Sequence, residues 1–169
     1  MNSPLPEKLT GQNEPGASLK VALWSLLLTR FILGGIFLYA GTIKAGASEE
    51  FALALIPFSI LPDSWTGPVA ILLAWTEITA GALILLPRVH RLGSALILVL
   101  ALVFIGVLTW ALANGIIVSC GCFGSDEPPS ASAMRTSILR DIAIAAAAAL
   151  TLFFSPGGRP AFKNKEAAG

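Results

Sequence analysis

Four apolar stretches of about 20 residues or more follow one another along this chain of 169 residues, and they restrict its fold more than any other feature. At 1.5 Å per residue, a helix of that length crosses a hydrocarbon core of about 30 Å. The chain is 55% hydrophobic and 12% charged, which is more apolar than a soluble domain of this size can hide. We therefore expect an all-α membrane protein, a four-helix transmembrane bundle.

The ends of the apolar stretches predict how the chain is divided. Residues 20–155 are expected to form one transmembrane domain. Residues 1–19 before it and 156–169 after it are expected to be polar tails. Residues 48–62 are apolar but contain two prolines and two acids and are too short to cross, which predicts a short interfacial or re-entrant helix. The expected spans are Lys20–Ile43, Gly67–Leu86, Leu92–Val118, and a fourth that begins at a cap on Ser130 or Ser132 and ends near Phe154.

Basic residues predict the orientation of the bundle. Seven of the eleven lysines and arginines lie in the two tails and in the turn between the second and third stretches, whereas Lys44 and Arg135 lie in the other loops. Both termini are therefore expected in the cytoplasm. The net charge of +1 provides no broad basic surface for nucleic acid, so the expected environment is a lipid bilayer.

Both cysteines of the chain follow the third apolar stretch, as Cys120-Gly121-Cys122, on the outer side of the membrane by this orientation. Residues two apart close a disulfide only through a small, distorted ring, and strained disulfides tend to be labile or catalytic. Gly121 permits backbone angles that other residues resist, so the pair can alternate between dithiol and disulfide. A structural pair and half of a metal site are the alternatives, but zinc needs about four ligands and His90 is the only histidine.

Four ionisable residues fall inside the expected spans, namely Arg30, Glu77, Arg140 and Asp141. Each costs about 2.5–3.5 kcal/mol at the centre of a span, so they should face the bundle interior and find partners. Arg30 and Glu77 each lie about ten residues from one surface of the membrane, which predicts that they pair near the midplane. Arg140 and Asp141 are adjacent and point about 100° apart, so we do not expect them to neutralise each other.

Arg140 lies in the outer third of its span, close in depth to Cys122, and is therefore expected to act on the cysteines. With Lys44 and Arg135 it would supply positive potential and favour the thiolate, the form that attacks a disulfide or a quinone. The alternative is that the charges within the spans only hold the four helices in register.

Several motifs together carry a resemblance to a known family. They are Arg30-x-x-x-Gly34-x-x-Phe37-x-x-Ala40-Gly41-x-x-Lys44, Glu77-x-x-x-Gly81, Cys120-Gly121-Cys122-Phe123-Gly124 and Arg140-Asp141. Over about residues 24–155 the chain resembles the methylamine-utilisation membrane proteins of the MauE family, within the wider DoxX-like group. The resemblance implies a protein of the bacterial inner membrane that works with a thioredoxin-like extracytoplasmic partner in disulfide metabolism.

The MauE family is also similar in layout to the quinone-coupled disulfide oxidases DsbB and vitamin K epoxide reductase. This implies a membrane thiol–disulfide oxidoreductase that uses a quinone, which is not covalently bound. Together with the depth and charge of Arg140, it leads us to expect Cys120, Cys122 and Arg140 as the catalytic residues. Those oxidases resemble each other in having more than one cysteine pair, whereas here one pair must meet both the protein partner and the electron acceptor. The expected quinone-binding residues are Lys44, Glu77, Phe123 and Arg140, and the expected structural charges are Arg30, Glu77 and Asp141.

Two other classes of function stay open. A non-catalytic membrane subunit or chaperone would use its cysteine loop to dock a partner enzyme, and replacing both cysteines would then impair assembly rather than thiol exchange. A small-solute carrier is supported by the charges within the spans and opposed by the absence of broken-helix repeat halves.

Overall fold

The structure, a computed structural model, describes residues 17–58, 62–117 and 130–154, and within these ranges every regular element is a helix. Four of the helices are long and apolar enough to cross a membrane. The all-α, four-span architecture predicted from the sequence is therefore confirmed. In chain order the elements are α1 (Ala17–Gly46), α2 (Ser48–Leu55), the 3₁₀ turn η1 (Ile56–Phe58), α3 (Asp63–Leu85), α4 (His90–Ala113) and α5 (Ala131–Phe154).

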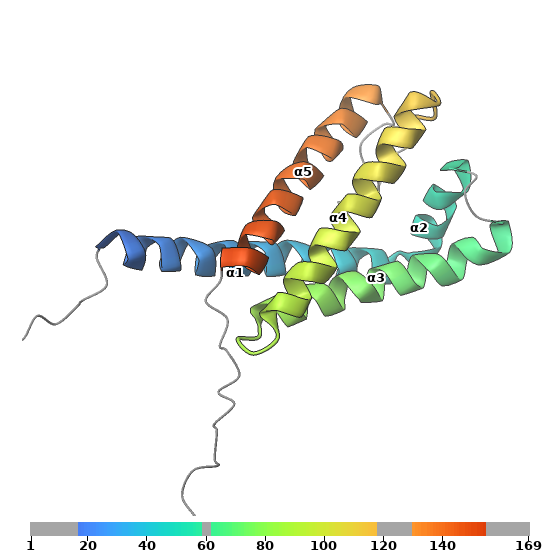
Figure 1. The fold of residues 1–169 in the computed structure, drawn as a ribbon. Coiled ribbons are helices and arrows are strands. Elements are labelled where there is room, and N and C mark those ends of the chain that lie inside the picture. Colours follow the sequence, from blue (N-terminus) through green and yellow to red (C-terminus); the bar gives the residue numbers. More distant parts are fainter. Residues whose placement is uncertain (1–16, 59–61, 118–129, 155–169) are drawn as a thin grey trace, which may run out of the picture.

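The four long helices form two antiparallel pairs, α1 with α3 and α4 with α5 (Figure 1). The short turn between α3 and α4 joins the two pairs. α2 lies against α3, at the end of α3 that is away from this turn. α2 and η1 are too short to cross a bilayer, as predicted. Their interfacial or re-entrant placement stays a prediction.

Glycines set the register between α1 and α3. A Cβ atom added to Gly81 would lie 2.9 Å from the carbonyl oxygen of Gly34, and one added to Gly34 would lie 3.1 Å from the carbonyl oxygen of Gly81. Such small residues let helix backbones approach closely in lipid, where packing replaces the hydrophobic effect as the cause of helix association. Gly34 is therefore level with Gly81 across the pair.

The second pair is attached to the first through α4. A Cβ atom on Gly93 would collide with the backbone of Ile84, so α4 begins in direct contact with the end of α3. At the next residue of α4, the hydroxyl of Ser94 lies 3.0 Å from that of Thr151, and this buried hydrogen bond joins α4 to α5. α3, α4 and α5 are thus in close contact near the α3–α4 turn.

The core of the described bundle contains two apolar clusters. The larger one joins all four long helices, and the smaller one joins η1, α4 and α5 near the other end of the bundle. Members of the larger cluster are Leu33, Phe37, Ala80, Ile84, Ile97, Leu100 and Ala148. Members of the smaller cluster are Phe58, Leu108, Ala111 and Met134.

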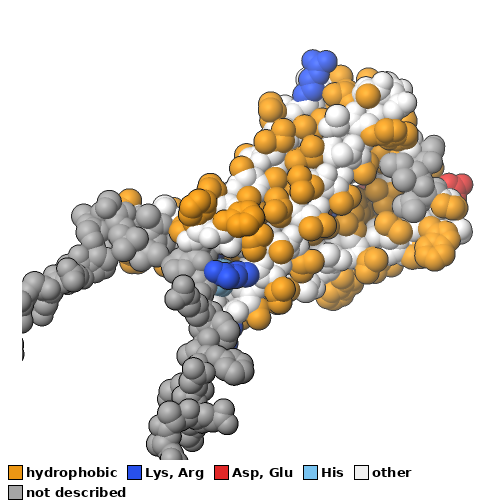
Figure 2. All heavy atoms as spheres, in the orientation of Figure 1, with side chains coloured by type: hydrophobic (Ala, Val, Ile, Leu, Met, Phe, Trp, Pro, Cys, Tyr) orange, Lys and Arg blue, Asp and Glu red, His pale blue; other side chains and the backbone are white. Residues whose placement is uncertain are grey.

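The outward faces of the long helices are also apolar, as Figure 2 shows for one side of the molecule. Large hydrophobic side chains such as Leu72, Leu92, Leu139 and Phe153 are more than half exposed. An apolar surface of this extent is untypical of soluble monomers and fits contact with lipid. The described structure is accordingly that of a multi-pass membrane protein.

One predicted span boundary is clearly wrong. We expected the third span to continue to Val118, whereas α4 ends at Ala113. Gly115 has a φ of +72°, and the amides of Gly115 and Ile116 donate to carbonyl oxygens in the last turn of α4. This is the Schellman arrangement, in which a glycine in the left-handed region ends a helix.

The fourth span begins where the sequence predicts. The Ser130 hydroxyl accepts a hydrogen bond of 3.1 Å from the Ala133 amide, so of the two proposed caps Ser130 makes the capping contact. The second span begins at Asp63, a few residues before the expected Gly67.

Candidate functional site

An ion pair between Lys44 and Glu77 lies at the centre of the candidate site. Lys44 Nζ is 2.5 Å from Glu77 Oε1, and the two side chains are 2% and 3% exposed. Lys44, which we expected in an outer loop, instead lies in the last turn of α1, and Glu77 lies on α3. A buried charge needs a partner of this kind, because an unpaired one is strongly destabilising within a bilayer.

The predicted pair of Arg30 with Glu77 is therefore wrong, and the register explains why. With Gly34 level with Gly81, Glu77 is level with residue 38 of α1, eight residues or about 12 Å from Arg30. Helical side chains lean toward the N-terminus of their own helix. In an antiparallel pair this brings Lys44 and Glu77 toward each other and moves Arg30 and Glu77 apart.

Arg30 has a different partner on α3. Its Nε and Nη2 atoms donate to the carbonyl oxygen of Ile84 at 3.1 and 3.0 Å. This carbonyl is one of the last four of α3, which do not accept the regular hydrogen bond from an amide four residues further along the helix. A cation at that position also interacts favourably with the helix dipole. Arg30 thus caps the end of α3.

Two aromatic rings surround the Lys44 ammonium. Its Nζ atom is 5.2 Å from the centroid of Phe51 on α2 and 5.0 Å from that of Phe104 on α4, within the range of cation–π attraction. Sequence reasoning missed both phenylalanines. Phe104 lies three and four residues from the buried Ala101 and Leu100 on α4, so helical periodicity was the available signal.

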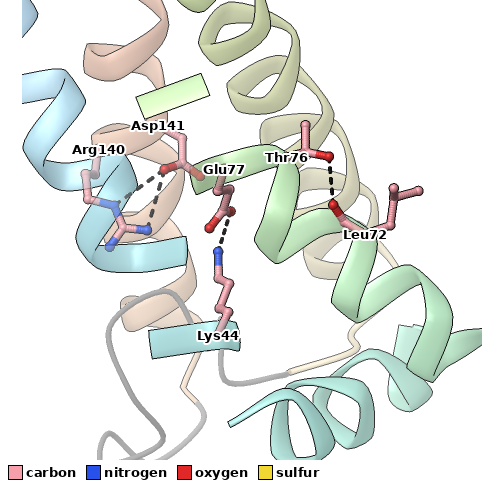
Figure 3. Close-up of polar contacts among 6 residues, drawn as sticks. All are labelled: Lys44, Leu72, Thr76, Glu77, Arg140 and Asp141. Carbon is pink, nitrogen blue, oxygen red and sulfur yellow. Dashed lines mark hydrogen bonds and ion pairs between the residues drawn. The ribbon is translucent and has the colours of Figure 1, made fainter. Parts of the chain in front are cut away.

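Arg140 and Asp141 do contact each other, contrary to our expectation. Arg140 Nε is 3.4 Å from Asp141 Oδ1, and the side chains are 31% and 9% exposed. The long arginine side chain can bend around the helix, so a difference of 100° between Cβ directions does not keep the charged groups apart. In Figure 3 the charged groups follow one another in the order Arg140, Asp141, Glu77 and Lys44.

These four charged side chains line one pocket, which is partly open at the bundle surface and has about 390 Å³ of space, open solvent included. They come from α1, α3 and α5, and their formal charges sum to zero. Within the described residues, Glu77 Oε2 and Asp141 Oδ2 are buried and have no hydrogen-bond partner. The rest of the lining is apolar and consists of Ile36, Phe37, Ala40, Ala101, Phe104 and Ile144.

An apolar pocket adjoins the charged one. It has about 380 Å³ of empty space between α2, η1 and α4, and Phe104 lines both pockets. A site with a few polar groups next to a larger apolar surface is typical of those that bind small molecules. The other lining residues are Phe51, Ala54, Leu55, Phe58, Val107 and Leu108.

Three of the predicted site residues, Cys120, Cys122 and Phe123, lie outside the described residues. The chain is described up to Ile117 and again from Ser130. The apolar pocket uses the half of α4 that is nearer to this connection, through Phe104 and Leu108, and the charged pocket lies close to the middle of α4 and α5, where Ala101, Arg140 and Ile144 line it. The structure brings Lys44, Glu77, Arg140 and Asp141 together and leaves Arg30 apart from them, at the C-terminal end of α3.

The fold and this site define a multi-pass membrane protein in which the spans enclose a charged pocket next to an apolar one. The chain belongs to the family described as methylamine utilisation protein MauE, whose model matches residues 22–154. The matched range includes every residue that lines the two pockets as well as the Cys-Gly-Cys segment. No curated protein and no solved structure matches the chain.

Proposed function

We propose that this protein is a membrane thiol–disulfide oxidoreductase. The pair Cys120 and Cys122 exchanges electrons between a thioredoxin-like or substrate protein outside the cytoplasm and a quinone in the bilayer. One cysteine forms a mixed disulfide with the partner protein, and the other resolves it. Arg140 favours the thiolate of the attacking cysteine.

The observation that carries the proposal is the position of the two pockets. The charged pocket lies close to the middle of α4 and α5, and the apolar pocket lies nearer to the end of α4 from which the cysteine-containing connection leaves. A lipid-soluble quinone has an apolar tail and a ring with polar oxygens, and the apolar and charged pockets match these two parts. Phe104, which lines both pockets, would contact the ligand where the two parts meet.

The proposed location is a bacterial inner membrane, with the cysteine pair on the extracytoplasmic side. Membership of the MauE family supports the membrane, and the basic residues of the tails and of the α3–α4 turn support the orientation. An even number of spans returns the chain to the side from which it entered, so the segments before α1 and after α5 share one side.

A trapped mixed disulfide tests the proposal. The variants Cys120→Ser and Cys122→Ser would each be expressed in membranes, and covalent adducts would be separated without reductant and identified by mass spectrometry. We expect one single variant to accumulate an adduct that a reductant releases, and the double variant to form none.

A different result would contradict the proposed thiol exchange. If neither single variant forms an adduct and the double variant fails to assemble with other proteins, the cysteine loop is a docking device. The protein is then a non-catalytic membrane subunit or chaperone.

A further inference from the structure

The charged pocket contains more hydrogen-bond acceptors than its own donors occupy. Lys44 holds Glu77 through Oε1, and Arg140 holds Asp141 through Oδ1. The second oxygen of each carboxylate is buried and accepts no hydrogen bond from any described residue. A buried polar atom left in this state is destabilising, so a ligand that donates hydrogen bonds there would remove the cost.

The charge balance of the pocket restricts which donor fits. The two cations and two carboxylates already sum to zero, so a charged ligand would leave a net charge inside the membrane. A neutral donor avoids that cost. The remaining walls, among them Phe37, Phe104 and Ile144, are apolar and suit a ring.

We infer that the charged pocket binds the quinol, the reduced form with two hydroxyl groups, in preference to the quinone. This inference rests on the proposed function, since that function supplies the ligand. A quinol has two hydroxyl groups, and a hydroxyl can donate a hydrogen bond to a free oxygen of Glu77 or of Asp141. A quinone presents only carbonyl oxygens, which accept and cannot satisfy those two atoms.

The preference favours one direction of the electron-transfer step within the protein. Two cysteine thiols lose two electrons and two protons and form one S–S bond. The quinone gains the two electrons and the two protons, and its two carbonyl groups become hydroxyls. Tighter binding of the quinol product makes the bound quinone a stronger oxidant, which favours electron transfer from the thiols to the quinone in the bound step.

Binding of the two redox forms tests the inference. The probes are a short-chain ubiquinone and its quinol, kept reduced without oxygen, and the protein is the full chain with Cys120→Ser and Cys122→Ser so that neither form is converted. Affinities would be measured by equilibrium dialysis in nanodiscs. We expect the quinol to bind at least about tenfold more tightly than the quinone. A hydrogen bond to a charged group contributes enough free energy for a difference of that size.

Three further variants, each made in the chain with Cys120→Ser and Cys122→Ser, identify the residues that cause the preference for the quinol. Glu77→Gln and Asp141→Asn replace a carboxylate by an amide of the same shape, and we expect each to reduce the preference severalfold. Thr76→Val is the matched control, because the hydroxyl of this neighbour of Glu77 bonds to Leu72 of its own helix and lies outside the pocket (Figure 3). It should keep the full preference.

Several results would overturn the inference: equal or tighter binding of the quinone, no binding of either form, or an undiminished preference in both amide variants. The proposed thiol exchange is judged separately by the trapped mixed disulfide, which forms without any added quinone. A failure of the quinol preference is therefore distinguishable from a failure of the proposed function.

Discussion

Replacing Lys44 and Glu77 by alanine, singly and together, tests the central contact of the charged pocket. Removing one partner of a buried ion pair costs about 3–5 kcal/mol. Glu77→Ala should fall at the lower end, because the Phe51 and Phe104 rings still attract the Lys44 ammonium. Lys44→Ala should fall at the upper end, because both oxygens of Glu77 then lack a partner next to Asp141. We expect the double variant to cost less than the sum by about 3 kcal/mol.

The free energy of unfolding would be measured by reversible denaturation in mixed micelles, followed by circular dichroism. The control is the corresponding cycle of Arg30→Ala with Glu77→Ala. These residues are about 12 Å apart along the helix axes, so their effects should add to within about 0.5 kcal/mol. Additive effects for Lys44 with Glu77, or strong coupling between Arg30 and Glu77, would refute the pairing.

Two further predictions concern helix packing and topology. Gly93→Ala should destabilise the protein by about 1–3 kcal/mol or prevent its folding, because the new methyl group meets the backbone of Ile84, whereas Gly106→Ala on the same helix meets nothing within 4 Å and should be nearly neutral in the same unfolding assay. A membrane-impermeant thiol reagent added to intact spheroplasts should label reduced Cys120 and Cys122. Labelling only after the membrane is opened would contradict the orientation.

The architecture could be predicted because it depends on length and composition. Apolar stretches of about 20 residues fix the number of spans, whatever the helices pack against. The end of α4 could also have been found, since Asn114-Gly115 is a typical helix end, but the apolar Ile116, Ile117 and Val118 that follow conceal it in a hydropathy pattern.

The pairing of the charges could not be predicted by counting residues from the membrane surface. That count assumes that the spans begin at one depth, whereas contact between Gly34 and Gly81 shifts α1 along α3. One useful signal was present, because Arg30, Phe37 and Lys44 are spaced by seven and belong to one buried helix face. The periodicity places Lys44 inside the bundle. Its pairing with Glu77 depends on the register of α1 against α3, which only the structure shows.

Dithiol-dependent reduction of a quinone tests the central claim most directly. The full chain in nanodiscs would receive dithiothreitol and a short-chain ubiquinone, and quinone loss would be followed by its absorbance, with the reaction of the two reagents alone subtracted. The account predicts that the wild-type protein accelerates quinone reduction and that Cys120→Ser and Cys122→Ser each abolish the acceleration. An equal rate in the wild type and in the variant that lacks both cysteines would contradict it.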